Sequence, residues 1–157
     1  MSILYPWVLW LHVLGAVVLF GTGLGTAFHM WMTHLRGDVA AIATTARNVV
    51  LADWLFTATA GVLQPLTGLV LIWLGGFDPL APWLLISYAL YVLALGCWLP
   101  VVWLQLRVRD MAVAAVARRE PLPERYYRYM RYWFMLGWPA FIALLVVFWL
   151  MLAKRPF

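Results

Sequence analysis

An uncharged stretch of about thirty residues, from Leu4 to Thr33, decides what kind of protein this chain can form. Because a helix rises about 1.5 Å per residue, roughly twenty apolar residues are enough to cross the hydrocarbon core of a bilayer. The stretch is also far longer than the apolar core of a signal peptide, so we expect it to be retained as a membrane helix. It nevertheless contains two histidines, His12 and His29, and an ionisable residue at that depth indicates a functional site.

The composition of the whole chain excludes an ordinary soluble domain. Hydrophobic residues make up 66% of the 157 positions and charged residues only 11%, whereas soluble domains average about 45–50% and about 25%. The excess apolar surface requires lipid to cover it. A single cysteine, Cys97, excludes an intramolecular disulfide.

The chain contains four apolar runs that are long enough to span a membrane. They lie at about 4–33, 49–74, 83–106 and 132–152. We therefore expect an all-α fold, a four-helix bundle that forms a single transmembrane domain. Asp38 can cap a short helix that leads into the second run, and Pro65 should kink or loosen that run. Pro121 and Pro123 should divide the polar segment between the third and fourth runs into two pieces.

The distribution of basic residues predicts the orientation of the bundle. The first and third connections together hold nine of the eleven Lys and Arg residues. The positive-inside rule places both connections in the cytoplasm and both termini outside, N-out and C-out. We expect a multi-pass protein of the bacterial inner (cytoplasmic) membrane, with the lipid bilayer as its partner. The net charge of +5 is concentrated in these connections, which favours a topological role over nucleic-acid binding.

Counting from the ends of the runs sorts the polar residues into two layers. The outer layer contains His12, Gln64, Tyr88 and Tyr91, and the inner layer contains His29, Asp53 and Gln105. His12 and His29 are roughly 25 Å apart along a straight helix, so they cannot ligate one metal together. Asp53 has three possible roles: it reaches lipid head groups, pairs with an arginine, or relays protons with His29.

His12 is the strongest candidate for a ligand. A neutral imidazole inside an apolar bundle is a good axial ligand for haem iron, and bundles build cofactor sites from facing helices. The small residues Gly15 and Ala16 would leave room beside it for a flat macrocycle. The alternative is a structural histidine whose ring is satisfied by Gln64, Tyr91 or a backbone carbonyl.

The second half of the first run carries a GxxxG pair, Gly21 and Gly25. Such a pair lets another helix approach closely, so a packing face is the simplest interpretation. This face, together with the shortage of further ligands inside the chain, makes a homodimer plausible.

Several sequence runs resemble a bacterial family of integral membrane proteins of unknown function (DUF2269-like). They are FGTGLGTAFHMW, VLADWLFTATA, QPLTGL, WLPVVWLQ and the Tyr-Arg-Tyr segment before the last helix. More distantly, the chain is similar to HemJ-type protoporphyrinogen oxidases and CopD-like membrane proteins. The shared features are the Leu11-His12 pair early in the first helix and the terminal segment Lys154 to Phe157. In HemJ-type proteins the first-helix histidine is implicated in binding haem b, which implies haem b at His12.

Two positions depart from the HemJ-type pattern. The arginine expected in the second half of helix one is absent from Ala27-Phe28-His29, and the histidine expected late in helix three is absent from Gly96 to Pro100. These departures disfavour porphyrinogen oxidation itself.

The resemblance therefore implies a haem b-binding membrane protein with a redox role, linked to a quinone or a porphyrin. His12 would be the metal ligand. The cofactor-binding candidates are His12, His29, Gln64, Tyr91 and Lys154. The second axial ligand would be a histidine of a dimer mate, a methionine or Lys154. The alternative is a non-enzymatic scaffold, an accessory subunit or a CopD-like metal transporter, and the sequence does not decide whether the protein is an enzyme.

Overall fold

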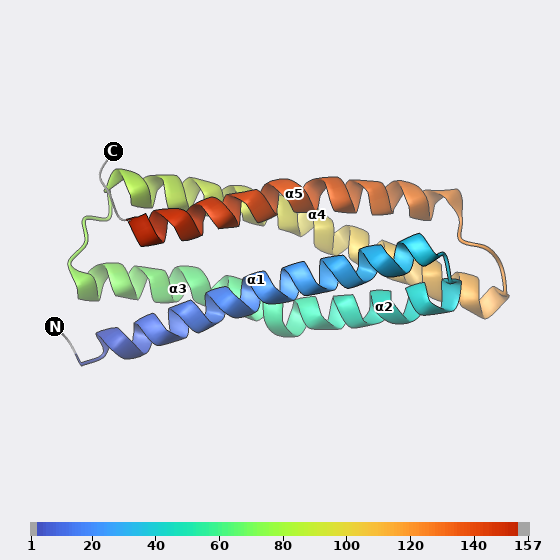
Figure 1. The fold of residues 1–157 in the computed structure, drawn as a ribbon, viewed down its shortest axis with the longest axis horizontal. Helices are drawn as coiled ribbons and strands as arrows, with labels where there is room; N and C mark the ends of the chain where they lie inside the picture. Colours follow the sequence, from blue (N-terminus) through green and yellow to red (C-terminus); the bar gives the residue numbers. More distant parts are fainter. Residues whose placement is uncertain (1–2, 154–157) are drawn as a thin grey trace.

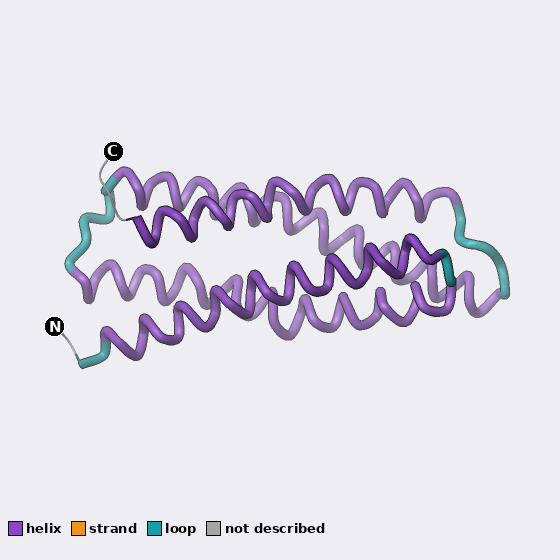
Figure 2. The backbone as a smooth tube through the Cα atoms, in the orientation of Figure 1, coloured by secondary structure: helices purple, strands orange, loops and turns teal. Residues whose placement is uncertain are grey.

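The computed structural model describes residues 3–153, and in this range the chain is helical with no strand (Figures 1 and 2). The elements are α1 (Tyr5–Arg36), α2 (Val39–Ala52), the π-helical turn η1 (Asp53–Thr57), α3 (Ala58–Gly75), α4 (Pro82–Arg118) and α5 (Glu124–Ala153). Because α2, η1 and α3 follow one another without a break, they form one long helix, Val39–Gly75. The described residues thus form four helices that are long and apolar enough to cross a membrane. The predicted all-α membrane bundle is confirmed.

The start of α1 and the end of α5 lie at the same end of the bundle (Figure 1). The turns between α1 and α2 and between α4 and α5 lie at the opposite end, and the loops are confined to the two ends (Figure 2). Four arginines adjoin those two turns, namely Arg36, Arg118, Arg119 and Arg125. The positive-inside rule assigns this arginine-rich end to the cytoplasm, and we call it the inner end below.

The helices at the inner end are longer than the apolar runs. Helix α4 continues to Arg118 and α5 begins at Glu124, so most of the polar segment is helical. Pro121 and Pro123 lie in the turn between them, as predicted. The expected short helix before the second span is not separate, because α2 runs directly into η1. The predicted cap is confirmed: the Asp38 carboxylate accepts hydrogen bonds from two backbone N–H groups at the start of α2.

The main hydrophobic core lies at the inner end. Its buried members come from α1, α2, α4, α5 and the α4–α5 turn. They are Met30, Ile42, Ala43, Ala46, Val49, Val101, Leu104, Val108, Ala112, Ala115, Leu122, Tyr126, Met130 and Trp133. Toward the outer end the helices separate into an α1–α3 pair and an α4–α5 pair (Figure 1). Ring stacking joins the two pairs, with Phe20 and Phe141 centroids 4.7 Å apart. Most large apolar side chains of the outer half are exposed, which is the surface that lipid covers.

The departure from α-helical geometry lies at η1 and not at Pro65. Helix α3 continues through Pro65, although proline has no N–H to donate to the carbonyl four residues earlier, that of Gly61. The hydroxyl group of Tyr91 on α4 donates a hydrogen bond to this carbonyl. A side chain of a neighbouring helix therefore replaces the backbone donor that proline removes.

This replacement predicts a specific coupling. Tyr91→Phe leaves the Gly61 carbonyl unpaired and should lower the free energy of unfolding by about 1 kcal/mol. In a Pro65→Ala background the helix supplies its own donor, so the same substitution should cost much less. Unfolding in mixed micelles measures both differences. Tyr88→Phe, at an exposed tyrosine of the same helix, is the control. Equal costs of Tyr91→Phe in the two backgrounds would contradict the explanation.

Candidate functional site

His12 lies between α1 and α3, toward the outer end of the bundle, and its side chain is half-buried. Its Nδ1 atom lies 2.7 Å from the Thr67 hydroxyl oxygen. Gly68 gives the ring room against α3, because a β-carbon at Gly68 would lie 3.5 Å from the His12 Cε1 atom. A hydrogen bond thus holds the ring against α3, and the absence of a side chain at Gly68 lets the ring lie close to that helix.

The hydrogen bonds of Thr67 are compatible with a metal-ligating tautomer of His12. The Thr67 hydroxyl has one hydrogen to donate, and its oxygen lies 2.7 Å from the Leu63 carbonyl oxygen, which can only accept. When Thr67 donates to Leu63, its oxygen accepts from Nδ1–H of His12. The lone pair of Nε2 is then left free, which is the state that a metal-ligating histidine requires.

Gln64 binds the backbone of His12 and not its ring. The Gln64 Nε2 atom donates to the His12 carbonyl oxygen at 2.9 Å. A β-carbon at Gly15 would lie only 2.6 Å from the same Nε2 atom. The space that Gly15 leaves is therefore filled by Gln64, and the expectation that it makes room for a macrocycle is wrong.

The remaining predicted site residues do not surround His12. Tyr91 binds the Gly61 carbonyl and Gln64 binds the His12 carbonyl, so neither side chain satisfies the histidine ring in the way that the structural alternative required. His29 is exposed at the inner half of α1, where its Nε2 atom lies 3.5 Å from the Thr45 hydroxyl. Lys154 lies outside the residues that the structure describes.

The inner layer is partly assembled as predicted. Asp53 accepts a hydrogen bond of 2.9 Å from the Thr57 hydroxyl, and the Gln105 side chain supplies a second one. Asp53 is only 6% exposed, so the expectation that it reaches lipid head groups or an arginine is wrong. The histidine of this layer, His29, has Thr45 as its neighbour instead.

Sequence reasoning missed the hydroxyl partners Thr67 and Thr57. Thr67 lies four residues after Leu63, and Thr57 lies four residues after Asp53. Threonine is common in membrane helices, so this spacing alone indicates no function. It also missed the inner-end contact in which His34 Nδ1 lies 3.1 Å from the hydroxyl of the buried Tyr126. No pattern in the sequence links these two residues, because they are brought together only by the packing of α1 against α5.

The residues at His12 fit one axial ligand of a haem. Nε2 of the fixed ring would supply the donor, and residues 3–153 contain no group of three or more His, Cys, Asp or Glu side chains that could hold a metal ion. Two small pockets in the described part of the chain are lined by Gln105 and not by His12. A macrocycle at His12 would therefore be covered by lipid or by a second protein chain.

The fold and its polar sites define a four-helix integral membrane protein. A family model described as "predicted integral membrane protein (DUF2269)" matches residues 6–155, so the chain belongs to this family. No curated protein and no solved structure matches the chain significantly. The likeness to HemJ-type and CopD-like proteins stays an expectation from the residues quoted above.

The close approach of α1 and α3 predicts that a side chain at position 15 destabilises the protein. Gly15→Ala should lower the free energy of unfolding by about 1–3 kcal/mol, because its β-carbon would overlap the Gln64 amide. Shortening Gln64 to alanine in the same protein should recover part of this loss. Gly21→Ala is the matched control on the same helix, since its β-carbon meets nothing within 4 Å. Thermal unfolding in detergent compares the variants, and equal effects at both glycines would contradict the packing.

Proposed function

We propose that this protein binds haem b through His12 and has a redox role in the membrane. The observation that carries the proposal is the orientation of the imidazole: Thr67 contacts Nδ1, which leaves the lone pair of Nε2 free when Thr67 donates to Leu63. A ligating histidine is usually fixed in this way through its other ring nitrogen. The resemblance of the Leu11-His12 pair to HemJ-type proteins agrees with the same residue.

Each residue around His12 has a role that its contacts explain. Thr67 holds the ring through Nδ1, and its hydrogen bond to the Leu63 carbonyl orients the hydroxyl. Gln64 ties the backbone of His12 to α3, and Gly68 keeps the ring close to that helix. When bound, the haem would supply a one-electron redox centre, and a quinone or a porphyrin is the proposed partner. A scaffold or an accessory subunit would make no use of the oriented imidazole.

A second copy of the chain is the proposed source of the missing ligand and cover. Gly21 and Gly25 are exposed on α1, and a β-carbon at either would meet nothing within 4 Å. The GxxxG face is thus not used for packing inside the described part of the chain, and it is open to another helix. We place the homodimer in the bacterial inner membrane, with the inner end in the cytoplasm.

The haem proposal is tested by spectroscopy of the protein purified in mild detergent after expression with adequate haem supply. We expect Soret and α bands that sharpen on reduction with dithionite and vanish in His12→Ala. Thr67→Val, which keeps the side-chain shape but not the hydroxyl, should weaken haem binding roughly 10-fold. His29→Ala and His34→Ala are matched controls on the same helix and should keep the bands. A colourless wild-type protein, or loss of the bands in His29→Ala alone, would refute the assignment.

The homodimer is tested by light scattering of the protein in detergent. Gly21→Leu and Gly25→Leu should convert a dimer into a monomer, because leucine keeps the helices apart. Gly96→Leu, at an equally open glycine of α4, should leave the dimer unchanged. A monomeric wild-type protein, or equal disruption by all three substitutions, would argue against this interface.

A further inference from the structure

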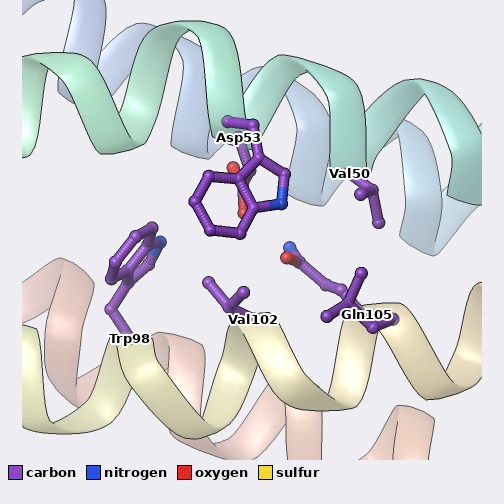
Figure 3. A pocket seen from close by; sticks show the side chains of 7 residues that line it. Val50, Asp53, Trp98, Val102 and Gln105 are labelled. Carbon is purple, nitrogen blue, oxygen red and sulfur yellow. The ribbon is translucent and has the colours of Figure 1, made fainter.

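A buried carboxyl group lies in the inner half of the bundle with only neutral partners. Asp53 is in the π turn η1, between α2 and α3, and it faces α4. The Thr57 hydroxyl and the Gln105 side chain are its hydrogen-bonding partners. Figure 3 shows the Asp53 carboxyl and the Gln105 amide turned toward each other between the two helices, with Trp98 beside them.

The helices around η1 bring no charged partner to Asp53. Along these helices, the titratable or charged side chains at about the depth of Asp53 are those of His29 on α1, Arg47 on α2, and Cys97 and Arg107 on α4. His29, Arg47 and Arg107 are exposed, and Cys97 is half-buried. Helix α3 has no titratable side chain. None of the ion pairs and hydrogen bonds recorded in residues 3–153 joins one of these groups to Asp53.

Two opposing effects act on this carboxyl group. Removal from water disfavours its ionised form, whereas O–H and N–H donors favour that form. A carboxyl group that is buried, has neutral donors and lacks a fixed counter-ion can exist in either state. π-helical turns often occur at functional sites, and acidic residues inside membrane spans often mark proton pathways.

Unpaired polar atoms lie on both sides of Asp53, with Gln105 and Trp133 toward the inner end. Trp98 Nε1, Gln105 Oε1 and Trp133 Nε1 are buried and have no hydrogen-bond partner in the described part of the chain. Gln105 and Trp133 are each more than nine-tenths buried, and both line the same small cavity. That cavity is just large enough for one water molecule. A water there would accept from the Trp133 N–H group and donate to the Gln105 carbonyl oxygen.

We propose that Asp53 is a proton-binding site, which exchanges its proton with the cytoplasmic side by way of a water held between Gln105 and Trp133. In the uptake step a hydronium ion gives up a proton and becomes water, while the carboxylate gains an O–H bond. The release step is the reverse, and neither step needs an oxidant or a reductant. Gln105 is a positioning residue, because its N–H group binds the carboxyl and its carbonyl oxygen binds the water. The proposal does not depend on haem.

Infrared difference spectroscopy between acidic and alkaline pH tests the proposal directly. The chain has only six Asp and Glu residues, so a single carboxyl can be resolved. We expect a band of a protonated carboxyl in an apolar environment, which shifts in D₂O and disappears in Asp53→Asn. Asp110→Asn, at an exposed aspartate, should keep that band. Identical difference spectra for the wild type and Asp53→Asn would overturn the proposal.

The route through the water is tested by the rate at which the Asp53 carboxyl exchanges its hydrogen with D₂O. Trp133→Phe keeps an aromatic ring but removes the N–H group, so it should slow the exchange severalfold. Trp138→Phe, at an exposed tryptophan of the same helix, should leave the rate unchanged. Gln105→Leu should slow the exchange as well. Equal rates in the wild type and Trp133→Phe would overturn the route.

A labelling experiment keeps the proposal testable if Asp53→Asn does not fold. The hydrophobic reagent dicyclohexylcarbodiimide reacts with protonated carboxyl groups inside membranes. In the wild-type protein, mass spectrometry should locate the adduct at Asp53, with labelling that falls as the pH rises. Labelling confined to the exposed Asp38, Asp78 and Asp110 would overturn the proposal.

Discussion

The absence of water in the bilayer is the constraint on which the structure depends. Every polar group in the apolar core must find its partner within the protein, because an unpaired group there costs several kcal/mol. The Gly61 carbonyl, which lacks a backbone donor because of Pro65, accepts a hydrogen bond from the Tyr91 hydroxyl. The Thr33 and Thr67 hydroxyls donate to carbonyls one turn earlier in their own helices. Against this general pairing, the few buried groups without a partner are exceptional, and they gather around Gln105.

The packing of the bundle follows from where the helices leave the bilayer. At the inner end they extend past the apolar runs, so they must bury their own faces as a soluble domain does. Small residues such as Ala46 on α2 and Ala112 on α4 are buried there, and they let the backbones come close. In the outer half lipid covers the apolar faces, and a dense core is not required. The His12 contacts are therefore made by one helix pair, whereas Asp53 is enclosed by several helices.

The sequence predicts the fold well because long apolar runs predict the membrane spans and clustered arginines predict their orientation. It also predicts depth: His12 and Gln64 share a level, and so do Asp53 and Gln105, as their contacts show. It does not predict which atoms meet, because that depends on the rotation of each helix about its own axis. For this reason the ring of His12 is found on Thr67, which no sequence pattern distinguishes from other threonines.

The π turn explains how one helix can present both polar sites. The buried face of this region contains Val49, Asp53, Thr57 and Ala60. The first three of these residues are spaced four apart along the chain. In a regular helix of 3.6 residues per turn, two such steps of four residues would rotate the inward face by roughly 80°. A π turn has more residues per turn and absorbs that rotation. Asp53 and Thr57 consequently stay on the inward face, one above the other, where the Thr57 hydroxyl reaches the carboxyl. The rest of the helix then continues in phase toward α1, where its Thr67 hydroxyl meets the His12 ring.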